Sequence, residues 1–340
     1  MKMYRVAILG ATGAVGREML KVLEERDLPI ASLKLLASKR SVGKTMLFKG
    51  KEIAIEEANE NSFDDLDLVL GAAENDIAKR FLPIAAKKGA VVIDNSSAYR
   101  LDDQVPLVVP EVNPQDAFEH HGIIANPNCA TIIALVALQP LHQAFGAKRM
   151  IVSTYQAVSG AGVGGIAELN EQMKQLVNHE EISAPKTFQH QIVCNLIPQI
   201  GGFNDEGYSS EEMKMQNEGR KILHAEDLLV NCTCVRVPVI RSHSESITVT
   251  FEKEVDVAKA KEALSKAPGV RLVDDPANAL YPMPLDTSDQ DLVFVGRIRK
   301  DISDPSNHSL TFWCCGDQVR KGAATNAVQI AQLLIEKEQE

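Results

Sequence analysis

Three glycines near the start of the chain limit what its first segment can fold into. Gly10, Gly13 and Gly16 follow the apolar run Arg5–Leu9 and open the helix-like segment Gly16–Glu25. A glycine-rich turn between a strand and a helix lets the backbone approach a pyrophosphate, which the N–H groups at the helix N-terminus then bind. The spacing is GxxGxxG rather than the GxGxxG of the standard fingerprint, so a turn without a ligand stays an alternative.

The first half of the chain repeats this strand-then-helix order. Apolar runs bounded by polar or glycine residues predict strands, and apolar residues at helical spacing predict helices. A β-α-β order favours a parallel sheet covered on both faces, so we expect an α/β, Rossmann-like N-terminal domain. The predicted strands are Arg5–Leu9, Leu33–Ala37, Leu66–Ala72 and Ala90–Asp94, and the predicted helices are Gly16–Glu25 and Ala78–Lys88.

Beyond residue 129 strands predominate. Ile247, Val249 and Phe251 alternate with hydroxyl residues, which is typical of a strand with one exposed face. Strands with helices on one side indicate an α+β second domain, and a free sheet face suits dimerisation. The predicted strands are Met150–Gln156, Cys232–Val239, Ser246–Glu252, Val293–Arg299 and Leu310–Cys314, and the predicted helices are Gly165–Val177, Ser210–Leu223, Val257–Lys266 and the amphipathic Arg320–Glu338.

Bulk properties exclude several classes of protein. The 340 residues are enough for two domains, and the formal net charge of −10 argues against a general nucleic-acid binder. The chain opens without a signal-peptide pattern, and its longest apolar stretch, around Ala130–Leu138, is too short to span a bilayer. The six cysteines are scattered and fit neither a disulfide framework nor a zinc site. We therefore expect a reduced, cytoplasmic protein without a bound metal.

The end of the second predicted strand indicates which dinucleotide is bound. An NAD enzyme typically carries Asp or Glu there, to bind the adenosine ribose. This chain has Ser38, Lys39, Arg40 and Ser41 instead. Because an arginine beside a hydroxyl group can pair with a 2′-phosphate, this loop favours NADP. The alternative is a solvated basic loop.

Cys129 is the strongest candidate for a nucleophile. It lies between a loop that contains Pro127 and the apolar run Ile132–Leu138, which predicts a thiol in the first turn of a buried helix. The partial positive charge of a helix N-terminus favours thiolate over thiol, and a thiolate is nucleophilic. The alternative is a small buried apolar residue that happens to open a helix.

Other polar residues carry weaker signals. A histidine between two serines, such as His243, is ordinarily a polar loop residue, and Glu211 and Lys214 on one helix face are ordinarily a solvated ion pair. Arg236 in an apolar strand needs an anionic partner, either an internal carboxylate or a substrate. His243 comes seven positions after Arg236, so on one continuous strand the two side chains face opposite sides. A break, for which Pro238 is a candidate, is needed to bring both into one site.

Six short motifs occur along the chain in a characteristic order. They are Gly-Ala-Thr-Gly-Ala-Val-Gly (10–16), Ser-Ser-Ala-Tyr-Arg (96–100), Asn-Pro-Asn-Cys (126–129), Gln-Ala-Val-Ser-Gly-Ala-Gly (156–162), Glu-Glu-Met-Lys (211–214) and Arg-Val-Pro-Val-Ile-Arg-Ser-His (236–243). In this order they resemble aspartate-semialdehyde dehydrogenases, and the resemblance runs essentially from end to end.

The resemblance implies a fold and a reaction. The fold is an N-terminal NADP-binding domain, residues 1–128, completed by a C-terminal helix at 319–340, and a catalytic and dimerisation domain at 129–318. The reaction reversibly converts aspartyl phosphate and NADPH to aspartate semialdehyde, phosphate and NADP⁺. In cells it serves the synthesis of lysine, methionine and threonine, and the protein is expected to be a homodimer.

The resemblance also implies residue roles. Cys129 attacks the carbonyl and carries a thioester, His243 is the general acid and base, and Gln156 positions the intermediate. Arg236 binds the substrate α-carboxylate and Glu211 meets its amino group. The phosphate-binding set is Arg100, Asn128 and Lys214, although Arg100 taken alone, after the end of a strand, is more typical of a plain surface residue. The residues implied to contact NADP are Gly10, Thr12, Gly13, Ala14, Val15, Arg40, Ser41, Ser159, Gly160 and Gln318.

One departure and three alternatives remain. Residues 70–77 contain Ala-Ala-Glu-Asn where the family has a small Gly- and Ser-rich turn, which leaves the NADP contacts there open. N-acetyl-glutamyl-phosphate reductase shares the chemistry, but Glu211 suits a free ammonium group. Glyceraldehyde-phosphate dehydrogenase has Ser-Cys-Thr-Thr-Asn at its nucleophile, which this chain lacks. A non-catalytic NADP-binding regulator does not need Cys129 and His243 together.

Overall fold

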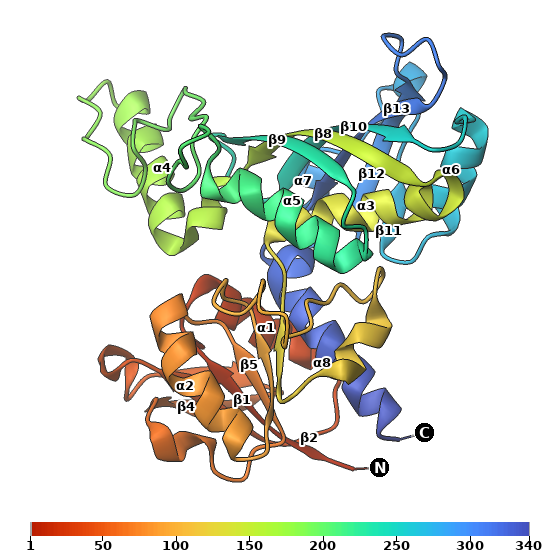
Figure 1. Cartoon of the computed structure of the whole chain (residues 1–340). Helices are drawn as coiled ribbons and strands as arrows, with labels where there is room; N and C mark the ends of the chain where they lie inside the picture. The colour runs from red at the N-terminus through yellow and green to blue at the C-terminus, as the bar shows by residue number, and fades with distance from the viewer. Residues whose placement is uncertain (1, 340) are drawn as a thin grey trace. The chain divides into compact units, whose positions relative to one another are not determined.

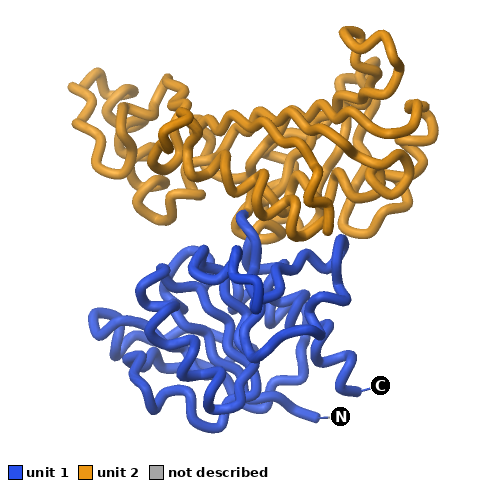
Figure 2. Tube along the Cα trace, viewed as in Figure 1, with its two compact units in different colours: residues 1–128, 323–340 blue, residues 129–322 orange. Residues whose placement is uncertain are grey.

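The computed structural model describes residues 2–339, which form two compact units (Figure 2). Unit 1 contains the described residues up to Asn128 and those from Ala323 onward, and unit 2 contains Cys129–Gly322. The chain therefore returns to unit 1 at Ala323, whereas the segment predicted to return starts at residue 319.

Unit 1 is built on one sheet with the strand order β3-β4-β2-β1-β5-β6-β7. Neighbouring strands are parallel except for β3 and β4, an antiparallel hairpin at one edge. The predicted α/β class is confirmed, although β3, β4 and β7 were not predicted. The elements are β1 (Tyr4–Leu9), α1 (Ala14–Glu25), β2 (Ile30–Ala37), β3 (Thr45–Phe48), β4 (Lys51–Glu57), β5 (Leu68–Gly71), α2 (Asn75–Lys87), β6 (Val91–Asp94), β7 (Ile123–Ala125) and α8 (Thr325–Lys337).

Both faces of this sheet are buried. In β1, Val6 and Ile8 join a core cluster with α1 and α8, whereas Ala7 and Leu9 join a second cluster with α2. Successive residues of a strand point to opposite faces, so a strand that is apolar on both sides must be covered twice. The sequence 320–338 is not one uniform helix, because Arg320–Ala324 forms a π-helical turn before α8 begins.

Unit 2 contains a mixed sheet in the order β11-β12-β13-β10-β8-β9. The predicted α+β second domain is confirmed. Predicted strand 232–239 is too long at its end, because β9 stops at Arg236. The elements are α3 (Cys129–Phe145), β8 (Ala147–Gln156), α4 (Gly162–Val177), α5 (Ser210–Leu223), β9 (Leu229–Arg236), β10 (His243–Phe251), α6 (Val257–Lys266), β11 (Val270–Leu272), α7 (Pro284–Thr287), β12 (Val293–Lys300) and β13 (Ser309–Gly316).

The sheet of unit 2 is packed against α3, α5 and α6 (Figure 1). In β10, Ile247, Val249 and Phe251 are buried, whereas the hydroxyl residues between them are half-buried. The alternation predicted from the sequence therefore separates an inner apolar face from an outer polar one. Within residues 2–339, no helix is both long and apolar enough to cross a membrane.

Candidate active site

The thiol of Cys129 lies at the start of α3, as predicted. Cys129 is the first residue of this helix and is half-buried, while residues 130–138 behind it are almost entirely buried. The first turn of α3 holds no acidic residue. The sulfur of Cys129 is 3.5 Å from Nε2 of His243, the first residue of β10. Both residues belong to unit 2, so the sequence-predicted pair is brought together within one unit.

Two strand ends, rather than one bent strand, place Arg236 and His243 in the same region. Arg236 is the last residue of β9 and His243 the first of β10. Residues 237–242 connect the strands, and Ser242 has a φ of +73° immediately before His243. The expected conflict between opposite faces of one strand does not arise, because each residue belongs to a different strand.

The backbone of a single residue, Ala157, contacts both side chains. The N–H of Ala157 donates to Nδ1 of His243 at 3.1 Å, and its carbonyl accepts from Nη1 of Arg236 at 2.8 Å. Ala157 directly follows β8 and is fully buried. Sequence reasoning missed this residue because the interacting groups are backbone atoms, which no side-chain pattern identifies.

Burial controls the charge of these groups. Desolvation, followed by the charge of Arg236, lowers the pKa of His243 to about 3, although Glu211 opposes the shift. The imidazole is therefore neutral near pH 7. Desolvation also lowers the pKa of Arg236, with Glu211 opposing it. An arginine keeps its charge even when its pKa falls, so the site contains a buried cation beside a neutral ring.

Glu211 and Lys214 form an ion pair in α5, with 3.0 Å between Oε2 and Nζ. The pair is not simply a solvated one, because Glu211 is 7% exposed. Its other oxygen, Oε1, accepts from Nε2 of Gln156 at 3.3 Å. Gln156 is the last residue of β8 and is itself buried. The structure therefore connects three of the predicted site residues.

Ser159 and Gly160 lie in a short 3₁₀ turn, Val158–Ala161, and Ser159 is hydrogen-bonded to Gln318. Nε2 of Gln318 donates to Oγ of Ser159, and Oε1 accepts from the N–H of Ser242 at 2.9 Å. A Cβ on Gly160 would lie 2.7 Å from Nη1 of Arg236 and 3.2 Å from Cε1 of His243. A side chain at this position would therefore force Arg236 or His243 to shift.

The glycine loop of unit 1 has the geometry expected for a dinucleotide. Gly10 has a φ of +87°, and a Cβ there would lie 2.6 Å from the carbonyl oxygen of Ala72. A Cβ on Gly16 would lie 2.3 Å from the oxygen of Gly10. Gly13 is the N-cap of α1 and brings no side chain to that end, and no acidic residue lies in the first turn. The N–H groups that begin α1, from Ala14 and Val15 onward, thus fit a phosphate group.

The loop predicted to recognise a 2′-phosphate lies next to the glycine loop. Oγ1 of Thr12 is 3.4 Å from Oγ of Ser41, and Arg40 beside it is exposed. Residues 70–77 also border the glycine loop, because Ala72 contacts Gly10. The structure thus places a departure from the family pattern at the glycine loop.

Arg100 and Asn128 are both buried in unit 1. Nη2 of Arg100 donates to the carbonyl of Asn95 at 2.9 Å, so this residue is not plain surface. Asn128 directly precedes Cys129 in the chain. Lys214, the third member of the predicted phosphate-binding set, belongs to unit 2, and their joint role stays a prediction.

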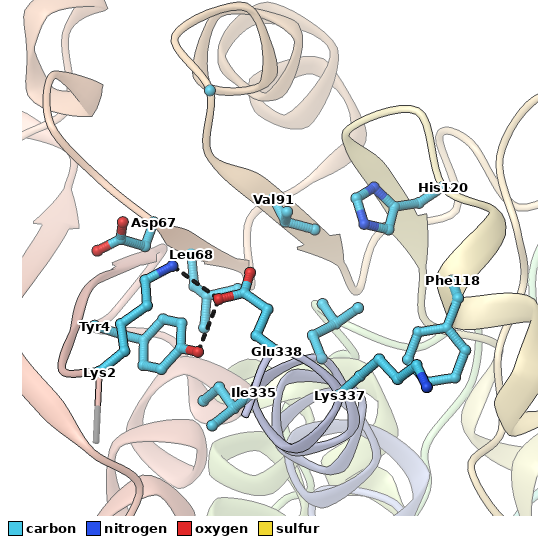
Figure 3. A pocket seen from close by; sticks show the side chains of 12 residues that line it. Lys2, Tyr4, Asp67, Leu68, Val91, Phe118, His120, Ile335, Lys337 and Glu338 are labelled. Atoms are coloured by element: carbon cyan, nitrogen blue, oxygen red, sulfur yellow. Dashed lines mark hydrogen bonds and ion pairs between the residues drawn. The ribbon is translucent and has the colours of Figure 1, made fainter. Parts of the chain in front are cut away.

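A cavity of 260 Å³ lies elsewhere in unit 1, beside the amino ends of β1, β5 and β6 and the last turn of α8 (Figure 3). Glu338 accepts from both Lys2 and Tyr4 there, at 2.8 and 2.9 Å. The glycine loop follows the opposite, carboxyl end of β1, so this cavity is not the dinucleotide site. Among the described residues, no group of three or more His, Cys, Asp or Glu side chains is arranged to hold a metal ion.

Comparisons with known proteins identify the family. Residues 5–120 match the family model described as "Semialdehyde dehydrogenase, NAD binding domain", and residues 138–321 match "Semialdehyde dehydrogenase, dimerisation domain". The chain is 53% identical over 338 residues to the aspartate-semialdehyde dehydrogenase of Aquifex aeolicus (strain VF5), covering 98% of each chain. The chain belongs to the aspartate-semialdehyde dehydrogenase family. The resemblance predicted from the six motifs is confirmed.

Solved structures of aspartate-semialdehyde dehydrogenases have the same fold. The enzyme II of Vibrio cholerae, complexed with ASA, has a TM-score of 0.96 and 45% identity and covers 99% of both chains. The Candida albicans enzyme, solved with NADP, has a TM-score of 0.74 and 25% identity, and likewise covers 99% of both chains.

One buried acid was not predicted from the sequence. Glu245 in β10 is fully buried, and among the described residues its Oε1 has no hydrogen-bond partner. Its other oxygen lies 4.0 Å from Sγ of Cys314. Desolvation, then the nearby Cys234 and Glu211, raises the pKa of Glu245 well above its usual value. Burial therefore favours the neutral, protonated form of this carboxyl group in the folded protein.

Replacing Glu245 with glutamine is expected to stabilise the protein, and more at pH 8 than at pH 5. A raised folded-state pKa gives stability that is present below the unfolded pKa and lost as the pH rises. As the pH rises, the free energy of unfolding of the wild type falls relative to that of the variant. The fall approaches about 1.4 kcal/mol per pH unit where the carboxyl group is protonated in the folded state and ionised in the unfolded state. Denaturant unfolding at both pH values checks this, with the exposed Glu254→Gln as control. Equal stability differences at pH 5 and pH 8 contradict it.

Proposed function

We propose that this protein catalyses the reversible, NADPH-dependent reductive dephosphorylation of L-aspartyl 4-phosphate to L-aspartate 4-semialdehyde. The observation that carries the proposal is the 3.5 Å contact between Cys129 and His243 at the N-terminus of α3. It is supported by relatives of this activity that match nearly the whole chain. The reaction belongs to the synthesis of lysine, methionine and threonine, and the proposed assembly is a cytoplasmic homodimer formed through the dimerisation domain.

Cys129 supplies the nucleophile in this proposal. Its sulfur attacks the C4 carbonyl carbon, and loss of phosphate leaves a thioester on the enzyme. The N-terminus of α3 favours the thiolate that attacks and that is later released. His243 is the residue that interacts with the oxygen of the carbon bonded to sulfur, because Nε2 of its ring already lies beside that sulfur. A thiol suits this chemistry better than a hydroxyl group, since a thioester is activated for the reverse attack by phosphate.

The remaining polar groups suit the substrate. Arg236 offers a buried guanidinium for the α-carboxylate, and Glu211 offers a carboxylate for the ammonium group. Gln156, hydrogen-bonded to Glu211, positions the intermediate. Arg100, Asn128 and Lys214 are the proposed phosphate-binding residues. The same Glu211 argues against an N-acylated substrate, which has no ammonium group to receive.

The cofactor is proposed to be NADP, held by the residues predicted from the sequence. In unit 1 these are Gly10, Thr12, Gly13, Ala14, Val15, Arg40 and Ser41, and in unit 2 they are Ser159, Gly160 and Gln318. Support comes from the uncapped start of α1, the contact of Thr12 with Ser41, and the NADP in the Candida albicans relative. When bound, the dinucleotide supplies the hydride that reduces the thioester carbon.

The test is an assay of NADP⁺ reduction by L-aspartate 4-semialdehyde, with and without phosphate. Phosphate-dependent reduction is expected. No turnover with this substrate, together with turnover of N-acetyl-glutamate semialdehyde, favours the related reductase instead. No turnover with either aldehyde, together with tight NADP binding, favours a regulator.

Arg40→Asp is expected to lower the preference for NADP⁺ over NAD⁺ by about 10- to 100-fold, because one charge-assisted hydrogen bond is lost and a repulsive carboxylate is added. The kcat/KM ratio for the two cofactors measures the effect. Lys39→Asp is the matched control, since Lys39 is exposed in the same 3₁₀ turn. A ratio that shifts equally in both variants points to general electrostatics of the loop and contradicts a specific role of Arg40.

A further inference from the structure

An aromatic ring, that of Phe188, lies against the guanidinium of Arg236. Cζ of Arg236 is 5.8 Å from the centroid of the ring. Arg236 is buried, Phe188 is half-buried, and both belong to unit 2. The face of an aromatic ring attracts a cation at this range, and the attraction grows when the cation is shielded from water. The ring therefore borders the group proposed to bind the substrate α-carboxylate.

A stacked ring orients the guanidinium of Arg236 without using its N–H donors. Nη1 donates to the carbonyl of Ala157 at 2.8 Å. A carboxylate binds a guanidinium best through two parallel N–H groups on one edge of the plane, and Nε and Nη2 form such an edge. Because the face of Phe188 attracts the cation as a whole, it restrains the guanidinium plane and leaves the edge of Nε and Nη2 to a ligand.

The segment that carries Phe188 is held by one face of α4. Residues 182–193, all of which the structure describes, contain neither helix nor strand. Glu168, Gln172 and Gln175 of α4 are spaced by four and three positions, so they lie on one face of the helix. Their side-chain oxygens accept backbone N–H groups on both sides of Phe188: Gln175 from Ser183 at 2.9 Å, Glu168 from Lys186 at 2.9 Å and from Thr187, and Gln172 from Ile192 and Val193, both at 3.1 Å. Hydrogen bonds to α4 thus replace regular secondary structure in positioning Phe188.

Packing against α4 fixes the ring itself. Phe188 packs against an apolar cluster that includes Val158 and Leu169. A Cβ on Gly165, in the first turn of α4, would lie 3.0 Å from Cζ of Phe188 and 2.3 Å from the carbonyl oxygen of Val158. A side chain at position 165 would therefore displace the ring or the turn at Val158. The ring is held between α4 and the guanidinium of Arg236.

The charges around Arg236 leave room for an anionic ligand. Glu211 is the carboxylate whose charge acts on Arg236. That carboxylate is already bound to Nζ of Lys214 at 3.0 Å and to Nε2 of Gln156 at 3.3 Å. A buried cation needs compensation, and an aromatic face supplies part of it without adding a negative charge that would repel a carboxylate.

We propose that Phe188 is a positioning residue that stacks on Arg236 and increases the selectivity of the enzyme for aldehydes that carry an α-carboxylate. The inference rests on the proposed function and deepens it, since it adds a residue that the six motifs do not contain. Phe188 acts through the guanidinium of Arg236, and the hydrogen bonds from α4 hold it in place.

The first test measures kcat/KM of Phe188→Leu and Phe188→Tyr with two aldehydes. One is aspartate semialdehyde, and the other is 3-aminopropanal, which has the amino group but no α-carboxylate. Leucine keeps an apolar side chain but removes the aromatic face. For aspartate semialdehyde, kcat/KM of Phe188→Leu should fall about 3- to 30-fold, the size of a cation–π contact, through a higher KM with kcat unchanged. With 3-aminopropanal it should stay as in wild type.

Tyrosine keeps the aromatic face, so Phe188→Tyr should retain the wild-type preference between the two aldehydes. Phe203→Leu is the matched control, because Phe203 is 54% exposed in the same unit and should leave the preference unchanged. If Phe188→Leu slows both aldehydes by the same factor, or if Phe188→Tyr loses the preference as Phe188→Leu does, the ring has only a packing role and the proposal is overturned.

The second test needs no substrate. Crystal structures of wild type and Phe188→Leu without ligands should show one orientation of the Arg236 guanidinium under the ring in wild type, and a changed or multiple orientation in the variant. The hydrogen bonds of Glu168 and Gln172 to the segment should be the same in both. An unchanged guanidinium in Phe188→Leu overturns the inference. Failure of the wild type to turn over aspartate semialdehyde overturns the proposed function instead, and the two crystal structures still decide whether Phe188 positions Arg236.

Discussion

Cys129→Ala is expected to abolish turnover of aspartate semialdehyde, with kcat at least about 10⁴-fold below wild type, the scale on which loss of a catalytic nucleophile is measured. No other described thiol has a histidine ring nitrogen beside it in the same way. Cys194 is exposed, and Cys232, Cys234, Cys314 and Cys315 are buried in the sheet. Burial raises the pKa of Cys315 to about 11 and makes it a poor nucleophile.

Stopped-flow absorbance at 340 nm measures the reaction, and circular dichroism confirms that the variant folds. Cys194→Ser is the matched control, since it removes an exposed thiol and should leave kcat unchanged. Iodoacetamide should label Cys129 fastest in wild type, and substrate should protect it. Robust activity in Cys129→Ala excludes covalent catalysis through this residue, and fast labelling at Cys194 alone argues against an activated Cys129.

Arg236→Leu is expected to reduce kcat/KM for aspartate semialdehyde by about 10²- to 10³-fold. A buried hydrogen bond between a guanidinium and a carboxylate is worth about 2–5 kcal/mol when one partner is removed. The same change also removes the bond to the carbonyl of Ala157, which helps to position His243. The loss therefore includes both substrate binding and site geometry, and a second substrate is needed to separate them.

An aldehyde that lacks the α-carboxylate, 3-aminopropanal, separates the two effects. Wild type should prefer aspartate semialdehyde strongly, and Arg236→Leu should lose most of that preference. Arg220→Leu is the control, since Nε of Arg220 donates to the carbonyl of Leu228 at 2.7 Å in the same unit. If Arg236→Leu slows both aldehydes by the same factor, Arg236 has a positioning role and does not bind the carboxylate.

Local patterns predicted much of the fold because they depend on neighbours along the chain. The glycine loop at residues 10–16, the start of α3 at Cys129 and the bounds of α5 and α6 follow from apolar period and turn residues, and all lie where they were expected. The hairpin β3–β4 was missed. Its two-residue turn is Lys49-Gly50, with φ of +47° and +76°. Asn or Asp before the glycine would have predicted such a turn, whereas lysine at that position does not.

The site was only partly predictable, because contacts between distant segments decide it. Cys129, His243 and Arg236 were recognised as candidate site residues from the sequence. Their spacing along the chain could not exclude a purely structural role for each of them. The break between β9 and β10 resolved the question for Arg236 and His243, since strand pairing across the sheet sets where each strand ends. Glu245 gave no signal, because a glutamate in an alternating strand is usually solvated.

By itself, the sequence determined the two-part α/β and α+β organisation, the thiol at a helix N-terminus and the family. These depend on periodicity and motif order, which are local. Only the tertiary structure decided that Sγ of Cys129 faces Nε2 of His243 while the peptide N–H of Ala157 occupies Nδ1. Which ring nitrogen of a neutral imidazole carries the proton depends on the donors and acceptors that packing brings to each nitrogen. That is a property of three segments far apart in the chain, and no single stretch of sequence contains it.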